Sequence, residues 1–243
     1  MNTVRIGTLS SVLGLICAMA SPVLSAQTST TQKTTPRRHM STGSLLNPAS
    51  LHATAPAVYH VRFHTTKGDF SIEVVRAWAP IGADRFYNLV EHHFYDDATL
   101  FRMIPRFVVQ FGIPADSRYG KIWTNANIKD DPVKESNLPG YVTYAQSSAP
   151  NSRSTQVFIN LGNNARLDGM HFAPFGKVTE GMSVIESFYS GYGDQPTGLQ
   201  DQITNQGNAF LEKNFPKLDK IVTARVVPAA PAHTAAPHPK PTS

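Results

Sequence analysis

The sequence predicts a mainly β domain whose strands close into an antiparallel barrel, with two amphipathic helices. Short runs of β-branched, aromatic and aliphatic residues recur from position 58 to position 227, which is typical of successive strands. Only two longer stretches carry apolar residues at helical spacing. A closed barrel is expected because closure leaves no strand edge unpaired.

Eight segments are expected as strands. In chain order they span residues 58–66, 70–75, 100–104, 107–111, 140–145, 156–160, 175–178 and 221–227. The first alternates between apolar and polar residues, and the turn Lys67-Gly68-Asp69 joins it to the second in an opening hairpin.

Two amphipathic helices and one shorter helix are expected, over residues 80–94, 181–189 and 208–213. Pro80 suits the first position of a helix, and Phe86 and Leu89 begin the apolar stripe of the first one. The polar stretch 114–139 is expected to be a loop with some local order, because loops of this length are usually functional or held by their own side chains.

The chain is organised around two short apolar runs on either side of Pro105-Arg106. A turn centred on Arg106 would pair Arg102 with Gln110 across a second hairpin. A cation beside an amide on an apolar strand face is costly unless it has a partner or a task. From the hairpin alone, a functional Arg102 and an edge-strand arginine that extends its charge to solvent are equally good interpretations.

Both ends of the chain are expected to lie outside the folded domain. Residues 1–26 have a basic start, an apolar run and small final residues, which predicts a secretory signal peptide cleaved after Ala26, with Ala20 as the second choice. Residues 27–57 and 228–243 are rich in Ser, Thr, Pro and Ala, which predicts a disordered linker and a disordered tail. The protein is therefore expected in the periplasm or outside the cell.

Neither a nucleic-acid partner nor a membrane span is expected. The net charge is +5, but the basic residues are scattered, so no nucleic-acid partner is expected. The apolar run of the signal peptide is too short to span a membrane comfortably, so no stable span is expected after processing. The domain is expected to be a monomer.

No disulfide or metal is expected in the mature chain. The single cysteine, Cys17, lies in the signal peptide, so stability must come from the core. His92 and His93 are adjacent, and neighbouring helical positions point about 100° apart, which argues against a shared metal. We expect His92 in solvent and His93 in the core.

Three sequence blocks resemble the motifs of the cyclophilins. Residues 100–112 read LFRMIPRFVVQFG, and the family has F-x-R-(I/V)-(I/V)-P-x-F-(M/V)-x-Q-x-G. Residues 144–159 resemble the family's M-A-N to S-Q-F-F-I segment, and 167–178, LDGMHFAPFGKV, resemble L-D-G-K-H-x-x-F-G-K-V. The resemblance implies an eight-stranded closed barrel with a helix over each end. It also implies a peptidyl-prolyl cis-trans isomerase that acts on proline-containing peptides and unfolded client proteins and so assists folding.

The chemistry of such an enzyme is the rotation of an X-Pro bond. Amide resonance opposes rotation with a barrier of about 18–20 kcal/mol. A donor that favours a pyramidal imide nitrogen lowers this barrier, and arginine suits the role because it stays charged and presents a planar fork. No nucleophile, metal or cofactor is required.

The resemblance assigns a role to each matching residue. Arg102 would be the donor, Gln110 would hold Arg102 or the substrate carbonyl, and both would act with Phe107 in catalysis. The remaining matches would bind the substrate, as the proline pocket or the path of the preceding residue; they are Val108, Ala145, Gln146, Gln156, Phe158, Leu167 and His171. Without the resemblance, ordinary core packing would be an alternative for Phe107, Phe158 and Leu167.

Some residues depart from the family pattern. Arg166 stands where many members have tryptophan, which implies weak cyclosporin binding with activity retained. Extra residues in the second and third blocks make His171 the least secure assignment.

A second hypothesis for the function is a binding module that holds proline-containing segments with little turnover. A hydrolase is disfavoured because the chain has no G-x-S-x-G motif.

Overall fold

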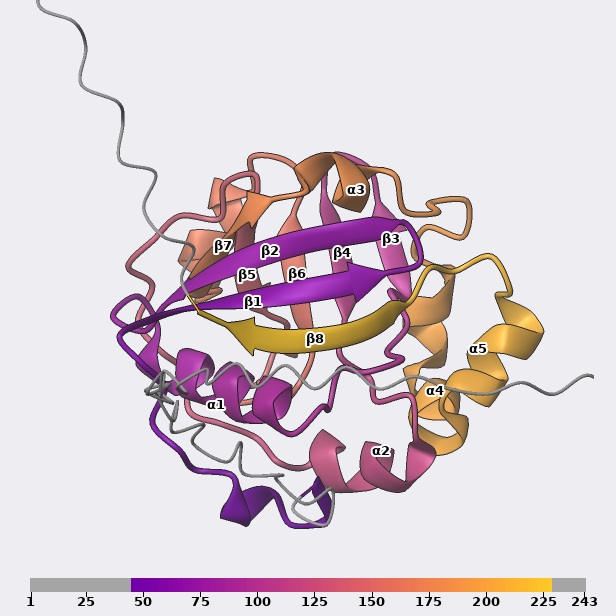
Figure 1. Ribbon diagram of the computed structural model, residues 1–243, viewed down its shortest axis with the longest axis horizontal. Helices are drawn as coiled ribbons and strands as arrows, with labels where there is room; N and C mark the ends of the chain where they lie inside the picture. Colours follow the sequence, from indigo (N-terminus) through magenta and orange to yellow (C-terminus); the bar gives the residue numbers. More distant parts are fainter. Residues whose placement is uncertain (1–44, 229–243) are drawn as a thin grey trace, which may run out of the picture. The chain divides into compact units, whose positions relative to one another are not determined.

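The computed structural model describes residues 45–228, and eight antiparallel strands form its framework (Figure 1). The strands are β1 (Val58–Thr65), β2 (Gly68–Val75), β3 (Arg102–Ile104), β4 (Val108–Phe111), β5 (Tyr141–Tyr144), β6 (Val157–Asn160), β7 (Pro174–Glu180) and β8 (Ile221–Val227). Their order in the sheet is β3-β4-β6-β5-β7-β2-β1-β8. All eight predicted strands are present, so the mainly β class is confirmed.

The sheet curls, but the predicted closed barrel is not confirmed. Strands β3 and β8 end the strand order, and no ladder joins them within the described residues. An isolated bridge, between Thr99 and Lys220, links the segments that precede these two strands. The eight strands of the described domain therefore form an open, curled sheet.

The main core fills the inside of this curled sheet. Helices α1 (Pro80–Glu91) and α3 (Met182–Glu186) lie on opposite sides of the front strands, below β8 and above β2 in Figure 1. Phe86 of α1 and Ile185 of α3 are fully buried in the same core as Phe63 and Phe111. The two amphipathic stretches thus cover the core as their apolar spacing predicted, although α3 is shorter than expected.

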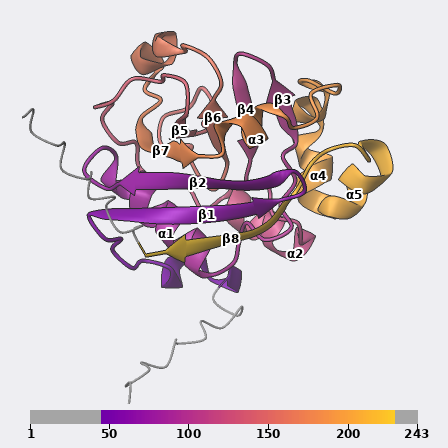
Figure 2. The same cartoon turned by 45° about the horizontal axis from the view of Figure 1, so that its top comes forward.

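A second, smaller core lies beside the central hairpin. Helices α4 (Gln200–Gln206) and α5 (Asn208–Asn214) lie next to β3 in both views (Figure 2). The buried members of this core come from the hairpin flanks and from the two helices with the turn after them; they are Phe101, Ile113, Ile203, Leu211 and Phe215. The expected short helix at 208–213 corresponds to α5.

The stretch 114–139 contains local order, as expected. Helix α2 (Ser117–Thr124) is capped by Asp116, whose carboxylate accepts a hydrogen bond from the Arg118 amide at 2.9 Å. Trp123 of this helix is fully buried, and its indole donates to the Leu45 carbonyl at 2.9 Å. The N-cap and the buried Trp123 hold this short helix in place.

Two expectations about segment ends are wrong. Residues 45–57 belong to the predicted linker, yet Leu45, Leu51 and Ala55 are buried in the main core. The sequence pattern missed them because residues 27–57 as a whole are polar and contain few large apolar side chains.

The first helix ends at Glu91, so the residues after it no longer follow the helical spacing. His92 is buried, with Nδ1 2.8 Å from the Asn88 carbonyl, and His93 is exposed, the reverse of the expectation. Residues 1–44 and 229–243, with the predicted signal peptide and nearly all of the tail, lie outside the described residues.

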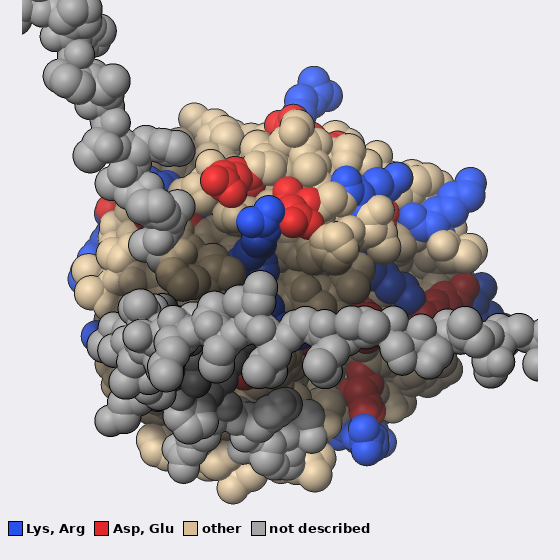
Figure 3. Space-filling model, viewed as in Figure 1, with Lys and Arg blue, Asp and Glu red and all other residues tan. Residues whose placement is uncertain are grey.

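The surface of the described domain carries both signs of charge. On the face seen in Figure 3, Lys and Arg side chains lie among Asp and Glu side chains.

Within residues 45–228, no group of three or more His, Cys, Asp or Glu side chains could hold a metal ion. No helix in the same range is long and apolar enough to cross a membrane.

Candidate active site

The central hairpin has the predicted register. Arg102 faces Gln110, and Ile104 faces Val108. Because side chains alternate along a strand, Val109 and Phe111 of β4 enter the main core, whereas Val108 and Gln110 lie on the other face. The site is therefore built on the outer face of the curled sheet, and the core behind it supports the strands.

An apolar pocket cluster forms on this outer face. Val108, Phe158 and Leu167 are 2%, 4% and 6% exposed and pack together. Phe158 reaches the cluster because β6 pairs with β4 and places it opposite Gln110. Three half-buried residues complete the pocket cluster: Phe107, Ala145 and Phe172. The structure thus brings together the predicted proline-pocket residues, with one exception described below.

Arg102 lies at the edge of the pocket cluster. Its Nη1 donates to Gln110 Oε1 at 3.3 Å, and its guanidinium carbon is 5.5 Å from the centre of the Phe107 ring. Its Nε lies 2.6 Å from Asp194 Oδ1, as an ion pair and not as an aligned hydrogen bond. A permanent cation therefore stands beside an apolar hollow that could hold a proline ring.

A chain of glutamines extends from the arginine. Gln110 is 6% exposed and donates from Nε2 to Gln156 Oε1 at 2.8 Å, and Gln156 donates from Nε2 to Gln200 Oε1 at 2.8 Å. These residues line a hollow of about 320 Å³ that also contacts Ala145 and Gln146. The residues predicted to line the path of the residue before proline therefore share one depression beside the pocket cluster.

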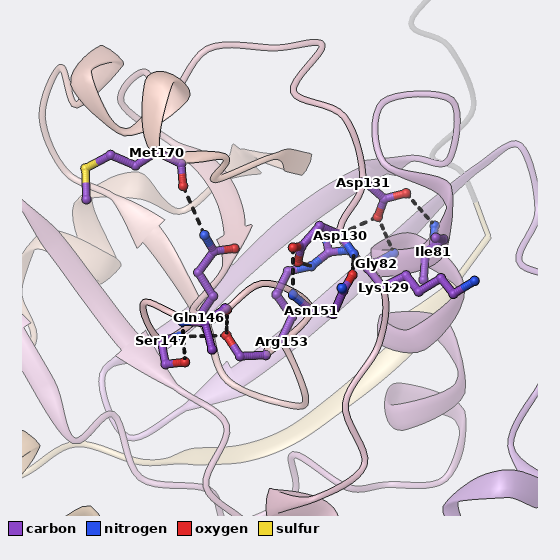
Figure 4. A network of polar contacts seen from close by, with 12 residues as sticks. Ile81, Gly82, Lys129, Asp130, Asp131, Gln146, Ser147, Asn151, Arg153 and Met170 are labelled. Carbon is purple, nitrogen blue, oxygen red and sulfur yellow. Dashed lines mark hydrogen bonds and ion pairs between the residues drawn. The ribbon is translucent and has the colours of Figure 1, made fainter.

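The loop between β5 and β6 is held by a buried charge network (Figure 4). Arg153 is 1% exposed, and its Nη1 donates to Asp131 Oδ2 at 3.1 Å. Asp131 also accepts the amides of Ile81 and Gly82 at 3.0 and 2.8 Å, at the start of α1. This network ties the loop that carries Gln146 and Gln156 to a core helix.

Asp168 fixes the 3-10 helix η3 (Ala165–Met170), which carries Leu167. Its carboxylate accepts from Ser136 Oγ at 2.5 Å and from the Asn137 amide and side chain at 3.0 and 2.8 Å. Burial raises the pKa of Asp168, but these hydrogen bonds together outweigh burial and lower it below its usual 3.8. The stabilisation by Asp168 is therefore present above pH 3.8 and lost as the pH falls through the lowered value.

Comparison with known proteins agrees with this geometry. The family model described as "Cyclophilin type peptidyl-prolyl cis-trans isomerase/CLD" matches residues 60–208. The chain belongs to the cyclophilin family. A peptidyl-prolyl cis-trans isomerase of Acinetobacter baylyi is 33% identical over 142 residues, which are 56% of this chain and 74% of that protein. The predicted isomerase function and enzyme class are thus confirmed.

Further relatives support the same family. The isomerase cypE of Dictyostelium discoideum is 33% identical over 128 residues, 52% of this chain and 81% of that protein. Two crystal structures share the cyclophilin fold. An isomerase of Cryptosporidium parvum has a TM-score of 0.54 at 19% identity, over 71% of this chain and 99% of that one. A cyclophilin of Hirschia baltica has a TM-score of 0.52 at 17% identity, over 71% and 75%.

One predicted pocket residue of this cyclophilin lies elsewhere. His171 is exposed, in the left-handed region with φ 64°, and does not pack in the pocket cluster. Phe172 takes that place, with its ring centre 5.8 Å from that of Phe158. The extra residue of the third motif shifts the register by one. His171 instead lines a neighbouring hollow of about 430 Å³ with Gln146.

Three contacts of this cyclophilin were missed from the sequence. Phe172 was hidden by the one-residue shift, which exact motif spacing could have revealed. Asp194 and Gln200 lie in a stretch rich in Gly, Asn and Gln, where we found no sequence signal for a role in the site. Gln146 donates to the Met170 carbonyl at 3.0 Å, which joins the two sides of the neighbouring hollow (Figure 4).

Proposed function

We propose that this cyclophilin isomerises X-Pro bonds in unfolded or extended polypeptides, with Arg102 as the hydrogen-bond donor. The pocket cluster would hold the proline ring, and the hollow beside Gln110 and Gln156 would take the residues before it. The observation that carries this proposal is the position of Arg102, a permanent cation 5.5 Å from the Phe107 ring at the edge of the pocket cluster.

The physical reason is differential stabilisation of the twisted bond. In the planar ground state the imide nitrogen shares its lone pair with the carbonyl, and in the twisted state the lone pair becomes available to a donor. A guanidinium that is already in place stabilises the twisted state more than the planar one, which raises the rate. The apolar pocket cluster supports the effect because it excludes water around the donor.

Relaxation of a short Ala-Pro-Phe reporter peptide at low temperature tests this function. We expect the full chain to accelerate the cis-to-trans relaxation, which takes about 10–100 s without catalyst at 25 °C. Binding of the same peptide is measured separately by titration. Binding without acceleration would favour the second hypothesis, a recognition module with little turnover, and would refute the enzyme.

Arg166 leads to a prediction about inhibition. Its guanidinium carbon lies 5.1 Å from the centre of the Phe107 ring, so a charged group stands where many cyclophilins present an indole. We expect cyclosporin to bind weakly because that apolar surface is missing. A titration of the wild type and of Arg166→Trp tests this: the variant should bind more tightly, and nanomolar inhibition of the wild type would contradict the prediction.

We also propose that the protein is an exported monomer that assists the folding of client proteins. The composition of residues 1–26 supports export. Mass spectrometry of the processed protein would show a start at Gln27 or at Ser21, and an uncleaved chain in the cytoplasm would refute export. Sedimentation gives the oligomeric state, and acceleration of a proline-limited refolding reaction tests the folding role.

A further inference from the structure

Two side chains outside the three cyclophilin motifs connect to the central hairpin, one directly and one through Gln156. Asp194 Oδ1 lies 2.6 Å from Arg102 Nε. Gln200 Oε1 accepts from Gln156, which in turn accepts from Gln110. Both contacts come from residues 194–200. Asp194 is the N-cap residue of the 3-10 helix η4 (Gln195–Leu199) and contacts Arg102 directly, and Gln200 begins α4 and reaches Gln110 through Gln156.

Thr197 orients both of these side chains. Its hydroxyl donates to Asp194 Oδ1 at 3.0 Å, the same oxygen that faces Arg102. Its backbone carbonyl accepts from Gln200 Nε2 at 3.3 Å. A single turn of 3-10 helix therefore fixes the direction of the carboxylate and of the amide.

The segment that carries these residues is attached to the hairpin by apolar contacts. Phe101, next to Arg102 in the chain, packs with Ile203 and Leu211 in the second core. Helix α4 also approaches α2 very closely, because a Cβ on Gly120 would lie 2.2 Å from the Thr204 carbonyl oxygen. Groups on packed helices hold their geometry better than groups on free loops.

We propose that Asp194 and Gln200 are positioning residues for isomerisation. The guanidinium of Arg102 is held at Nε by Asp194 and at Nη1 by Gln110, and Nη2 makes no hydrogen bond to residues 45–228. Nη2 is therefore left to donate to a bound peptide. Gln200 fixes Gln156, and through it the amide of Gln110. The inference rests on the proposed role of Arg102.

The expected effect is on turnover and not on folding or peptide affinity. The side chain of Asp194 is 60% exposed, so its ion pair contributes little to stability. Asp194→Asn keeps the shape but removes the charge that faces Nε, and we expect kcat to fall about fivefold. Gln200→Ala should lower kcat in the same way. KM should change little in Asp194→Asn, and the midpoint of thermal unfolding should change little in both variants.

Two matched controls lie on α4, the helix that Gln200 begins. Asp201 and Gln202 are exposed, and among the described residues they do not line the hollow beside Gln110. Asp201→Asn and Gln202→Ala should therefore behave as the wild type. Peptide relaxation is measured over a range of reporter concentrations in the full chain, which separates kcat from KM.

A double-mutant cycle distinguishes positioning from a general structural effect. Asp194→Asn should have a much smaller effect in an Arg102→Lys background, because lysine has no Nε–H fork to orient. Equal effects in the two backgrounds, or a kcat equal to that of the controls, would overturn the inference while the proposed function stands. A wild type that does not accelerate relaxation would overturn both.

Discussion

Arg102→Ala is expected to lower kcat/KM for the reporter peptide on the order of 100-fold to 1,000-fold, the loss that follows removal of one preorganised donor to a developing charge. Gln110 and Phe107 would remain, so the apolar pocket cluster would still hold the proline ring. Peptide affinity should therefore fall much less than turnover. Relaxation kinetics together with a binding titration measure the two quantities.

Two further variants make this result specific. Arg62→Ala removes an exposed arginine of β1 that pairs with Asp69, and it should leave kcat/KM unchanged. Arg102→Lys keeps the charge but loses the planar fork, so it should recover only part of the lost activity. A full rescue by lysine would show that charge alone suffices, and an Arg102→Ala variant with wild-type turnover would exclude the donor role.

The sequence predicted the hairpin of the candidate site correctly, because its pairing follows from local sequence pattern. The alternation around Pro105-Arg106 fixed the pairing of Arg102 with Gln110, because a hairpin register depends only on the turn and on two-residue periodicity. The eight strands and the helices that cover the main core were also predicted from local periodicity. The closed barrel was predicted but is not confirmed, since no ladder joins β3 to β8 within the described residues. Whether two strands so distant in the sequence pair is something that no local pattern encodes.

Long-range polar contacts were the part that sequence could not supply. Asp194 is one of many acidic residues in polar stretches. It meets Arg102 in a segment whose Tyr192 and Leu199 pack against the second core. His171 shows the opposite failure, since a motif match placed a side chain that the backbone turns outward. A residue's type and neighbours predict its strand or helix well, but not which remote side chain it will meet.

Asp131→Ala is expected to lower the free energy of unfolding by about 3–5 kcal/mol, the usual loss when one partner of a buried ion pair is removed. Arg153 would keep its charge at 1% exposure without its 3.1 Å partner. The amides of Ile81 and Gly82 would lose their acceptor at the start of α1, whose own N-cap residue, Ala79, offers no side-chain oxygen. Urea unfolding measures the change, as a lower midpoint with an unchanged slope.

The neighbouring Asp130 provides the control, because it carries the same charge in a less buried position. Its side chain is 26% exposed, and it lies 3.3 Å from Arg153 Nε without an aligned hydrogen bond, so Asp130→Ala should cost less. Asp131→Leu combined with Arg153→Met removes both charges, which often restores stability. Here recovery should be partial, because the Gly82 amide stays buried and unpaired. Full recovery would show that Asp131 acts only as a counter-ion and does not cap α1.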